Sequence, residues 1–131
     1  MTKPFVHIVD DNETALLLAS DICAALGLEA KTWQNSANFL VAAENDFPAD
    51  DIVILDVYMP ENDGVDVLRA LYAKNKLVKV ILVSAKNLDT LTFSALLAQA
   101  FGHQLLASIQ KPLTINALRS VITPLMRGND N

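Results

Sequence analysis

The sequence predicts an α/β fold, a doubly wound five-stranded parallel sheet with helices on both faces. Short apolar runs alternate five times along the chain with longer stretches whose apolar residues recur at helical spacing. Two of the runs consist almost entirely of Val, Ile and Leu, as expected of strands buried on both faces. The 131 residues are 52% hydrophobic, which is enough for one core. We therefore expect a single domain over residues 1–127, followed by a polar tail at residues 128–131.

The expected strands are the short apolar runs, at residues 5–9, 29–33, 52–55, 79–83 and 106–109. The stretches of helical periodicity follow them, at residues 13–26, 36–44, 64–75, 89–103 and 114–126. Ser36 and Asp89 can cap helix N-termini, whereas Gly27 and Gly102 lie where helices are expected to end. These start and stop signals agree with the periodicity.

Composition and charge exclude several classes of function. The net charge is -5, and the 10 Lys and Arg residues are spread along the chain. A surface that binds the nucleic-acid backbone needs clustered basic residues, so direct nucleic-acid binding is not expected. No segment approaches the roughly 20 apolar residues of a membrane span, and we expect a cytoplasmic protein. Cys23 falls among apolar residues at helical spacing, which indicates a buried thiol in a reducing compartment.

Polar side chains follow four of the five expected strands. Asp10 and Asp11 come after the first strand, Asp56 after the third, Ser84 after the fourth and Lys111 after the fifth. In an open parallel sheet, reactive groups gather beyond the carboxyl ends of the strands. The sequence therefore predicts that three carboxylates, a hydroxyl and an ammonium group meet in one crevice.

Other polar residues are predicted to lie away from this crevice. Asp50 and Asp51 precede the third strand, which places them at the opposite edge of the sheet as solvated loop charges. His7 lies inside the first strand and His103 near the end of the fourth helix. Each is expected to be a packed or surface histidine rather than a general base.

Three carboxylates close together favour a divalent cation, because like charges raise one another's pKa unless a cation neutralises them. Hard oxygen ligands suit Mg²⁺, which retains open positions for waters and a phosphate oxygen. A carboxylate in this setting can attack phosphorus, since phosphoryl transfer depends mainly on positioning and charge neutralisation. Lys111 would add to that neutralisation, and Ser84 could donate a hydrogen bond to a phosphoryl oxygen. The predicted product is an aspartyl phosphate.

Four short motifs, in this order, resemble the receiver domains of two-component response regulators, the CheY-like superfamily. They are Val9-Asp10-Asp11, Leu55-Asp56-Val57-Tyr58-Met59-Pro60 with Gly64 following, Val83-Ser84-Ala85 and Lys111-Pro112-Leu113. The resemblance covers the chain from Phe5 to about Met126. It implies a flavodoxin-like (βα)5 topology with strand order 2-1-3-4-5.

The resemblance also implies a role for each motif residue. Asp10 and Asp11 would be metal ligands, with the backbone carbonyl of Tyr58 as a further ligand. Asp56 would be both the phosphoacceptor and a metal ligand. Ser84 would be the switch hydroxyl, and Lys111 the cation that pairs with the phosphate. The family also has a cis peptide after its lysine, which predicts a cis Lys111–Pro112 bond.

Two features depart from the common receiver pattern, and one pair of residues corresponds to its variable positions. Ser108 stands where the family usually has an aromatic switch residue, three positions before the lysine. The stretch between Ser84 and Lys111 is longer than usual and resembles receivers joined to cyclic-di-GMP phosphodiesterase domains of the EAL type. Tyr58 and Lys86, two residues beyond Asp56 and Ser84, resemble the variable positions that tune the lifetime of the phosphate.

The resemblance implies a phosphoacceptor signalling domain, which catalyses only its own phosphorylation and dephosphorylation. Its phosphodonor would be a histidine kinase or a phosphotransfer protein. An effector domain or a downstream protein would bind the face formed by the fourth and fifth helices, and a phosphorylation-dependent homodimer is a further expectation.

Three alternatives stay open at this stage. A pseudo-receiver would keep the fold as an interaction module without phosphorylation. A haloacid-dehalogenase-like phosphatase would use Asp10 as nucleophile, but Asn12 stands where its second acid is required. Flavodoxin-like cofactor binding is disfavoured because no Gly- or Thr-rich phosphate loop follows the first strand.

Overall fold

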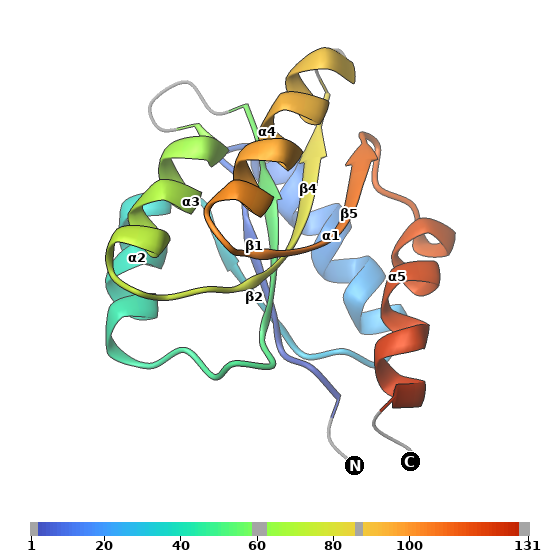
Figure 1. The fold of residues 1–131 in the computed structure, drawn as a ribbon. Coiled ribbons are helices and arrows are strands. Elements are labelled where there is room, and N and C mark those ends of the chain that lie inside the picture. The colour runs from blue at the N-terminus through green and yellow to red at the C-terminus, as the bar shows by residue number, and fades with distance from the viewer. Residues whose placement is uncertain (1–2, 59–62, 86–87, 129–131) are drawn as a thin grey trace.

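The computed structural model describes residues 3–58, 63–85 and 88–128, in which strands and helices alternate along the chain (Figure 1). In chain order, the elements are β1 (Val6–Val9), α1 (Glu13–Ala25), β2 (Ala30–Trp33), α2 (Ser36–Asn45), β3 (Ile52–Asp56), α3 (Gly64–Ala73), β4 (Lys79–Ser84), α4 (Leu88–Ala100), β5 (Gln104–Gln110) and α5 (Ile115–Gly128). Within the described residues, no helix is both long and apolar enough to cross a bilayer.

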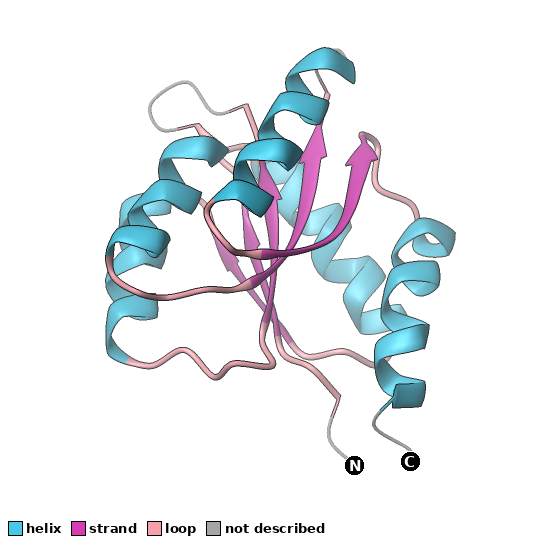
Figure 2. Ribbon diagram, in the orientation of Figure 1, coloured by secondary structure: helices cyan, strands magenta, loops and turns pink. Residues whose placement is uncertain are grey.

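All five strands pair in parallel, in the order β2-β1-β3-β4-β5. Helices α1 and α5 cover one face of the sheet, and α2, α3 and α4 cover the other (Figures 1 and 2). This arrangement confirms the predicted fold class and strand order. Every residue of β3 is buried, which explains why its sequence is apolar up to the terminal Asp56.

The sheet separates two apolar cores, and alternate residues of a strand enter opposite ones. On β3, Ile54 packs with α1 and α5, whereas Leu55 packs with α2, α3 and α4. Phe39 of α2 and Leu118 of α5 are fully buried in their respective cores. Cys23 lies in the core between the sheet and helices α1 and α5, where burial raises the pKa of its thiol to about 11. The predicted buried thiol is confirmed.

Some element boundaries differ from those predicted. Asn35, rather than Ser36, caps α2, and its side chain accepts hydrogen bonds from the backbone N–H groups of Ala37 and Asn38. Asp89 is the second residue of α4, not the residue before it. Helix α4 ends at Ala100, before Gly102, whose φ of +94° is incompatible with a continuing helix.

The prediction that Asp51 is a solvated loop charge is wrong. Its side chain is 12% exposed, and Oδ2 lies 3.0 Å from Nε2 of His7. The Nδ1 atom of the same ring accepts a hydrogen bond from Trp33 Nε1, and the ring stacks on Phe47. His7 of β1 and Asp51 therefore form a polar pair that aromatic rings enclose. Asp50 is exposed as predicted, with an ion pair to Lys79.

Candidate functional site

The three predicted carboxylates meet at the carboxyl edge of the sheet. Strands β1 and β3 are neighbours, with Val9 opposite Leu55, so Asp10 and Asp11 emerge beside Asp56. One carboxylate oxygen of each residue lies within 4.8 Å of the others. Asp10 and Asp56 are buried, whereas Asp11 is exposed at the rim. The site is thus an acidic cluster with two enclosed carboxylates and one that faces solvent.

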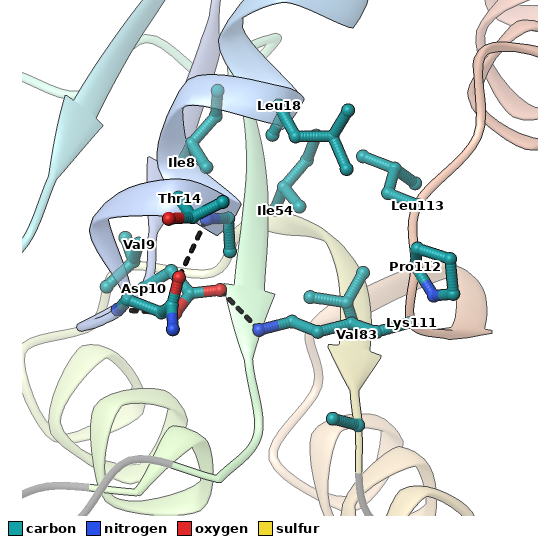
Figure 3. A pocket seen from close by; sticks show the side chains of 14 residues that line it. Ile8, Val9, Asp10, Thr14, Leu18, Ile54, Val83, Lys111, Pro112 and Leu113 are labelled. Carbon is teal, nitrogen blue, oxygen red and sulfur yellow. Dashed lines mark hydrogen bonds and ion pairs between the residues drawn. The ribbon is translucent and has the colours of Figure 1, made fainter.

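Lys111 brings the positive charge of the β5–α5 connection to this cluster. Its Nζ lies 2.6 Å from Asp10 Oδ2 and 3.5 Å from Asp56 Oδ2. Figure 3 shows the side chain extending toward Asp10. The Lys111 backbone N–H donates to the carbonyl of Ser84 at 2.8 Å, which fixes the start of the connection to the end of β4. The Lys111–Pro112 peptide is cis, as predicted.

Ser84 reaches the same edge from β4. It is the last residue of that strand and is fully buried. The backbone around it is tied to β3, because Val57 donates to the carbonyl of Val83 at 2.9 Å. The hydroxyl therefore belongs to the same end of the sheet as the carboxylates. All five residues predicted to converge lie at this edge: Asp56 and Ser84 end their strands, and Asp10, Asp11 and Lys111 follow theirs.

Burial and charge both act on Asp56. Burial, followed by the carboxylate of Asp10, raises the pKa of Asp56 from its ordinary value of 3.8 to about 6. The ammonium of Lys111 and the backbone N–H of Tyr58 act in the opposite direction without cancelling the rise. Within the described parts of the chain, three carboxylates face the single ammonium group of Lys111, so these residues together keep unneutralised negative charge.

The donor set of this cluster fits a divalent cation. Carboxylate oxygens are hard ligands, and a site with two or three of them is typical of Mg²⁺, which completes its shell with water or phosphate. Receiver domains typically bind Mg²⁺ at such an acidic cluster, and the grouping of Asp10, Asp11 and Asp56 matches that pattern.

Two backbone groups hold the buried carboxylates in place. The N–H of Asn12 donates to Asp10 Oδ1 at 2.9 Å, and the N–H of Tyr58 donates to Asp56 Oδ1 at 3.2 Å. The Asn12 side chain caps α1 by accepting from the N–H of Ala15. The sequence pattern showed Asn12 only as a residue that stands where a phosphatase needs a second acid, whereas in the structure it links the start of α1 to Asp10.

Gly64 is a second positioning residue whose role the motif alone did not reveal. It opens α3, and its N–H donates to the carbonyl of Val57 at 2.8 Å. A Cβ at this position would lie 2.8 Å from the backbone oxygen of Asp56 and 2.9 Å from Cα of Val57. Only glycine permits this approach of the helix to the end of β3.

The remaining predicted residues lie around the cluster or outside it. Tyr58 is 52% exposed beside Asp56, whereas Lys86 falls outside the described residues, as do Met59 and Pro60. Ser108 lies on the edge strand β5, where it pairs with Leu82 of β4, and its side chain is exposed. His103 is buried away from the cluster, between Leu68 and Val78, which confirms that it is a packed histidine.

The comparisons with known proteins agree with this geometry. The family model described as the response regulator receiver domain matches residues 6–123. The DNA-binding transcriptional regulator NtrC of Escherichia coli is 27% identical over 116 residues, which cover 88% of this chain and 23% of the relative. The transcriptional regulatory protein PrrA of Mycobacterium tuberculosis is 34% identical over 66% of this chain and 36% of its own length. The chain thus spans about a quarter to a third of these relatives.

Solved structures give the same result. A response regulator from Colwellia psychrerythraea superposes with a TM-score of 0.82 at 28% identity, covering 95% of this chain and 97% of that one. A response regulator receiver domain protein from Clostridium thermocellum shares the fold, with a TM-score of 0.78, 24% identity and 97% of both chains covered. On the family match, the fold and the acidic cluster together, this chain belongs to the response regulator receiver domain family of two-component signalling.

Proposed function

We propose that this chain accepts a phosphoryl group on Asp56 from a histidine kinase or a phosphotransfer protein, in an Mg²⁺-dependent reaction. The observation that carries the proposal is the convergence of Asp10, Asp11 and Asp56 within 4.8 Å, with Lys111 Nζ close to two of them. The arrangement provides a nucleophile, a set of hard oxygen ligands and a fixed cation in one place. Phosphoryl transfer to a carboxylate needs these three groups.

Each residue has a distinct part in the proposed reaction. Asp56 attacks phosphorus as the bond from phosphorus to the donor's nitrogen breaks, while the Tyr58 N–H holds its Oδ1. The ammonium of Lys111, 3.5 Å from Asp56 Oδ2, pairs with an oxygen of the transferred group. The Ser84 hydroxyl then donates to another phosphoryl oxygen, which couples the phosphate to β4.

Asp10, Asp11 and Asp56 would hold Mg²⁺, and the backbone carbonyl of Tyr58 would be a further ligand. When bound, the ion neutralises negative charge on the carboxylates and on the phosphoryl oxygens. In its absence, Lys111 is the one ammonium group that the described residues place against the three carboxylates, so the attack of one anion on another is opposed by electrostatic repulsion.

The phosphatase alternative is disfavoured by the position of Asn12. A nucleophilic Asp10 would need a second acid two residues later, but the Asn12 side chain caps α1 through Ala15. In addition, Asp10 Oδ2 is paired with Lys111 at 2.6 Å. Asp56 is thus better supported as the acceptor.

Mapping the phosphorylated residue tests the proposal. The chain is incubated with Mg²⁺ and acetyl phosphate, or with a phosphorylated histidine kinase, and intact and peptide masses are measured. We expect one added phosphoryl group on Asp56, lost in Asp56→Asn and in the presence of EDTA. Asp51→Asn is the matched control, because Asp51 is also buried but lies at the other edge of the sheet. Full labelling of Asp56→Asn would overturn the assignment.

Tyr58 and Lys86 are proposed to set the lifetime of the phosphate. Tyr58 is 52% exposed next to Asp56, where a bulky ring can shield the phosphoryl group from attacking water. Replacing Tyr58 with Asn should therefore speed the loss of phosphate in Mg²⁺ buffer by several-fold, measured by intact mass over time. An unchanged rate would show that the ring does not shield the phosphate.

Further parts of the proposal concern how phosphorylation of Asp56 is passed on to a partner. Ser108 occupies the expected position of the switch aromatic on β5, so the signal would reach α4 and α5 without a rotating ring. The proposed partner is an effector domain or downstream protein that binds the α4–α5 face, or a second phosphorylated copy of the chain. A cytoplasmic location, a domain boundary near residue 127 and membership of the type joined to EAL domains belong to the same proposal.

A further inference from the structure

An apolar pocket adjoins the acidic cluster on the side of α1. It lies between the start of α1 and the β5–α5 connection and has a volume of about 420 Å³. Ile8, Ile54 and Val83, from three neighbouring strands, line it together with Leu18 of α1 and Leu113 (Figure 3). Leu18 is 41% exposed, so the pocket opens to solvent beside α1.

The polar end of the pocket adjoins the acidic cluster. Asp10 and Lys111 both line it and form an ion pair at 2.6 Å. Asp11 and Asp56 do not line the pocket, but each has a carboxylate oxygen within 4.8 Å of that of Asp10. Among the described residues, the ammonium group of Lys111 therefore accompanies three carboxylates where the apolar space ends.

This combination determines the chemistry of a ligand. Volumes of roughly 300–1,000 Å³ with a mostly apolar lining and a few polar groups are typical of small-molecule sites. A hydrocarbon or aryl group would replace water over Ile8, Ile54 and Leu113. A carboxylate head would be repelled by the three acids, whereas a cationic head meets complementary charge.

We propose that this pocket binds small amphipathic amines, with the hydrocarbon part between α1 and Leu113 and the ammonium head beside Asp10, at the edge of the acidic cluster. Such a ligand shares its carboxylates with the Mg²⁺ of the proposed function. Amine and metal therefore weaken each other's binding by the same factor, because coupling between two ligands is reciprocal. This competition rests on the proposed function, whereas amine binding itself does not.

A series of ligands tests the pocket on the wild-type chain without metal. Butylamine, hexylamine, hexanol and hexanoate are titrated in EDTA buffer at pH 8, and dissociation constants are obtained from NMR chemical-shift changes. Each additional buried methylene should tighten binding about fourfold. Hexylamine should bind roughly fivefold or more tightly than hexanol, and hexanoate more weakly than both. Affinity independent of chain length, or equal for amine and carboxylate, would overturn the proposal.

Two matched variants separate the pocket from nonspecific attraction of cations. Ala15 lines the pocket from α1, so Ala15→Leu should fill it and weaken hexylamine binding at least tenfold. Ala24 is exposed near the end of the same helix, and Ala24→Leu should bind like the wild type. Equal binding by Ala15→Leu and the wild type would place the amine outside the pocket.

Competition with Mg²⁺ distinguishes this inference from the proposed function. Millimolar MgCl₂ should weaken hexylamine binding, whereas NaCl of the same ionic strength should weaken it less. If acetyl phosphate labels Asp56 but hexylamine does not bind, the pocket proposal fails and the receiver function stands. If hexylamine binds and labelling fails at every residue, the proposed function fails and the pocket stands.

Discussion

Asp56 lies at the tip of β3, where burial and the neighbouring carboxylate of Asp10 both oppose its ionisation. The pKa of Asp56 is 3.8 ordinarily and about 6 in the folded protein. Because the folded state holds the proton more tightly, stabilisation linked to Asp56 is fully present below pH 3.8. It is lost as the pH rises through 6. The group that the proposed reaction needs in its ionised form thus destabilises the metal-free fold at neutral pH.

Asp56→Asn removes this ionisation while preserving the size of the side chain. In EDTA at pH 8, we expect the variant to have a free energy of unfolding up to about 3 kcal/mol higher than that of the wild type. The difference should shrink toward pH 4, where Asp56 is protonated in the folded state. Urea unfolding followed by circular dichroism at pH 4, 6 and 8 measures it.

The control for this experiment is Asp21→Asn, because Asp21 is exposed on α1. It should change the unfolding free energy little, and equally at all three pH values. A stability gain in Asp56→Asn that did not grow between pH 4 and pH 8 would mean that ionisation of Asp56 is not its source.

At the scale of the elements, His103 joins α3 to the chain entering β4. Its Nε2 lies 2.8 Å from the carbonyl oxygen of Leu68 and donates to it, and its Nδ1 accepts from the N–H of Val78 at 3.1 Å. Both contacts are satisfied only by the neutral ring with its proton on Nε2. Burial lowers the pKa of His103, because the charged ring would lose water and face the Val78 donor.

This contact predicts a loss of stability in mild acid. A depressed folded pKa means that the contribution of His103 is complete above pH 6.5 and falls as the pH drops and the unfolded chain takes up a proton. Protonation of Asp56 acts in the opposite direction over this range, but it contributes equally to the wild type and to a His103 variant. We therefore expect the loss due to His103 between pH 7.5 and pH 5 to appear as a difference between the two proteins. His103→Gln, whose amide offers a neutral donor and acceptor, should lose less over the same range. If urea unfolding showed the same change in unfolding free energy in both proteins, the pH dependence would come from groups other than His103.

Gly64 sets how closely α3 approaches the end of β3. An alanine on an open helix would be about 1 kcal/mol more favourable than glycine, but its Cβ would meet the backbone of Asp56 and Val57 below 3.0 Å. Gly64→Ala should therefore lower the unfolding free energy by about 1–3 kcal/mol and slow the labelling of Asp56 by acetyl phosphate. A stabilised variant would show that the helix has room to shift.

The sequence predicted most elements because burial on both faces leaves a strong pattern. Strands β3 and β4 are apolar runs, and each ends in a polar residue, Asp56 or Ser84, at the functional edge. Position relative to a strand end was therefore sufficient to group the site residues. The start of β5 was less predictable, because an irregularity between Val80 and Ile81 shifts its register.

Contacts between distant segments could not be predicted in the same way. Asp51 was expected in solvent because it precedes a strand, but a histidine from the neighbouring strand reaches it through an aromatic cluster. The approach of Gly64 to Asp56 likewise depends on how α3 packs, which no local pattern encodes. In both cases, the missing information is tertiary geometry rather than residue type.

At the scale of the whole molecule, the acidic cluster couples ligand binding to folding. The cluster forms only when β1, β3 and the β5–α5 connection are in place, so the proposed metal binds the folded state and not the unfolded chain. Such a ligand adds RT ln(1 + [L]/Kd) to the unfolding free energy. At a Mg²⁺ concentration tenfold above its Kd, the gain is about 1.4 kcal/mol.

Thermal and urea unfolding in MgCl₂ measure this gain, with NaCl of equal ionic strength to account for screening of surface charge. The wild type should be stabilised by Mg²⁺ beyond the NaCl reference, whereas Asp11→Asn should lose most of the effect, since it removes a proposed ligand exposed at the rim. Asp50→Asn is the matched control, because Asp50 is also exposed but lies at the opposite edge of the sheet. If Mg²⁺ stabilised Asp11→Asn as much as Asp50→Asn, the ion would bind elsewhere, and the carboxylate cluster would not be its site.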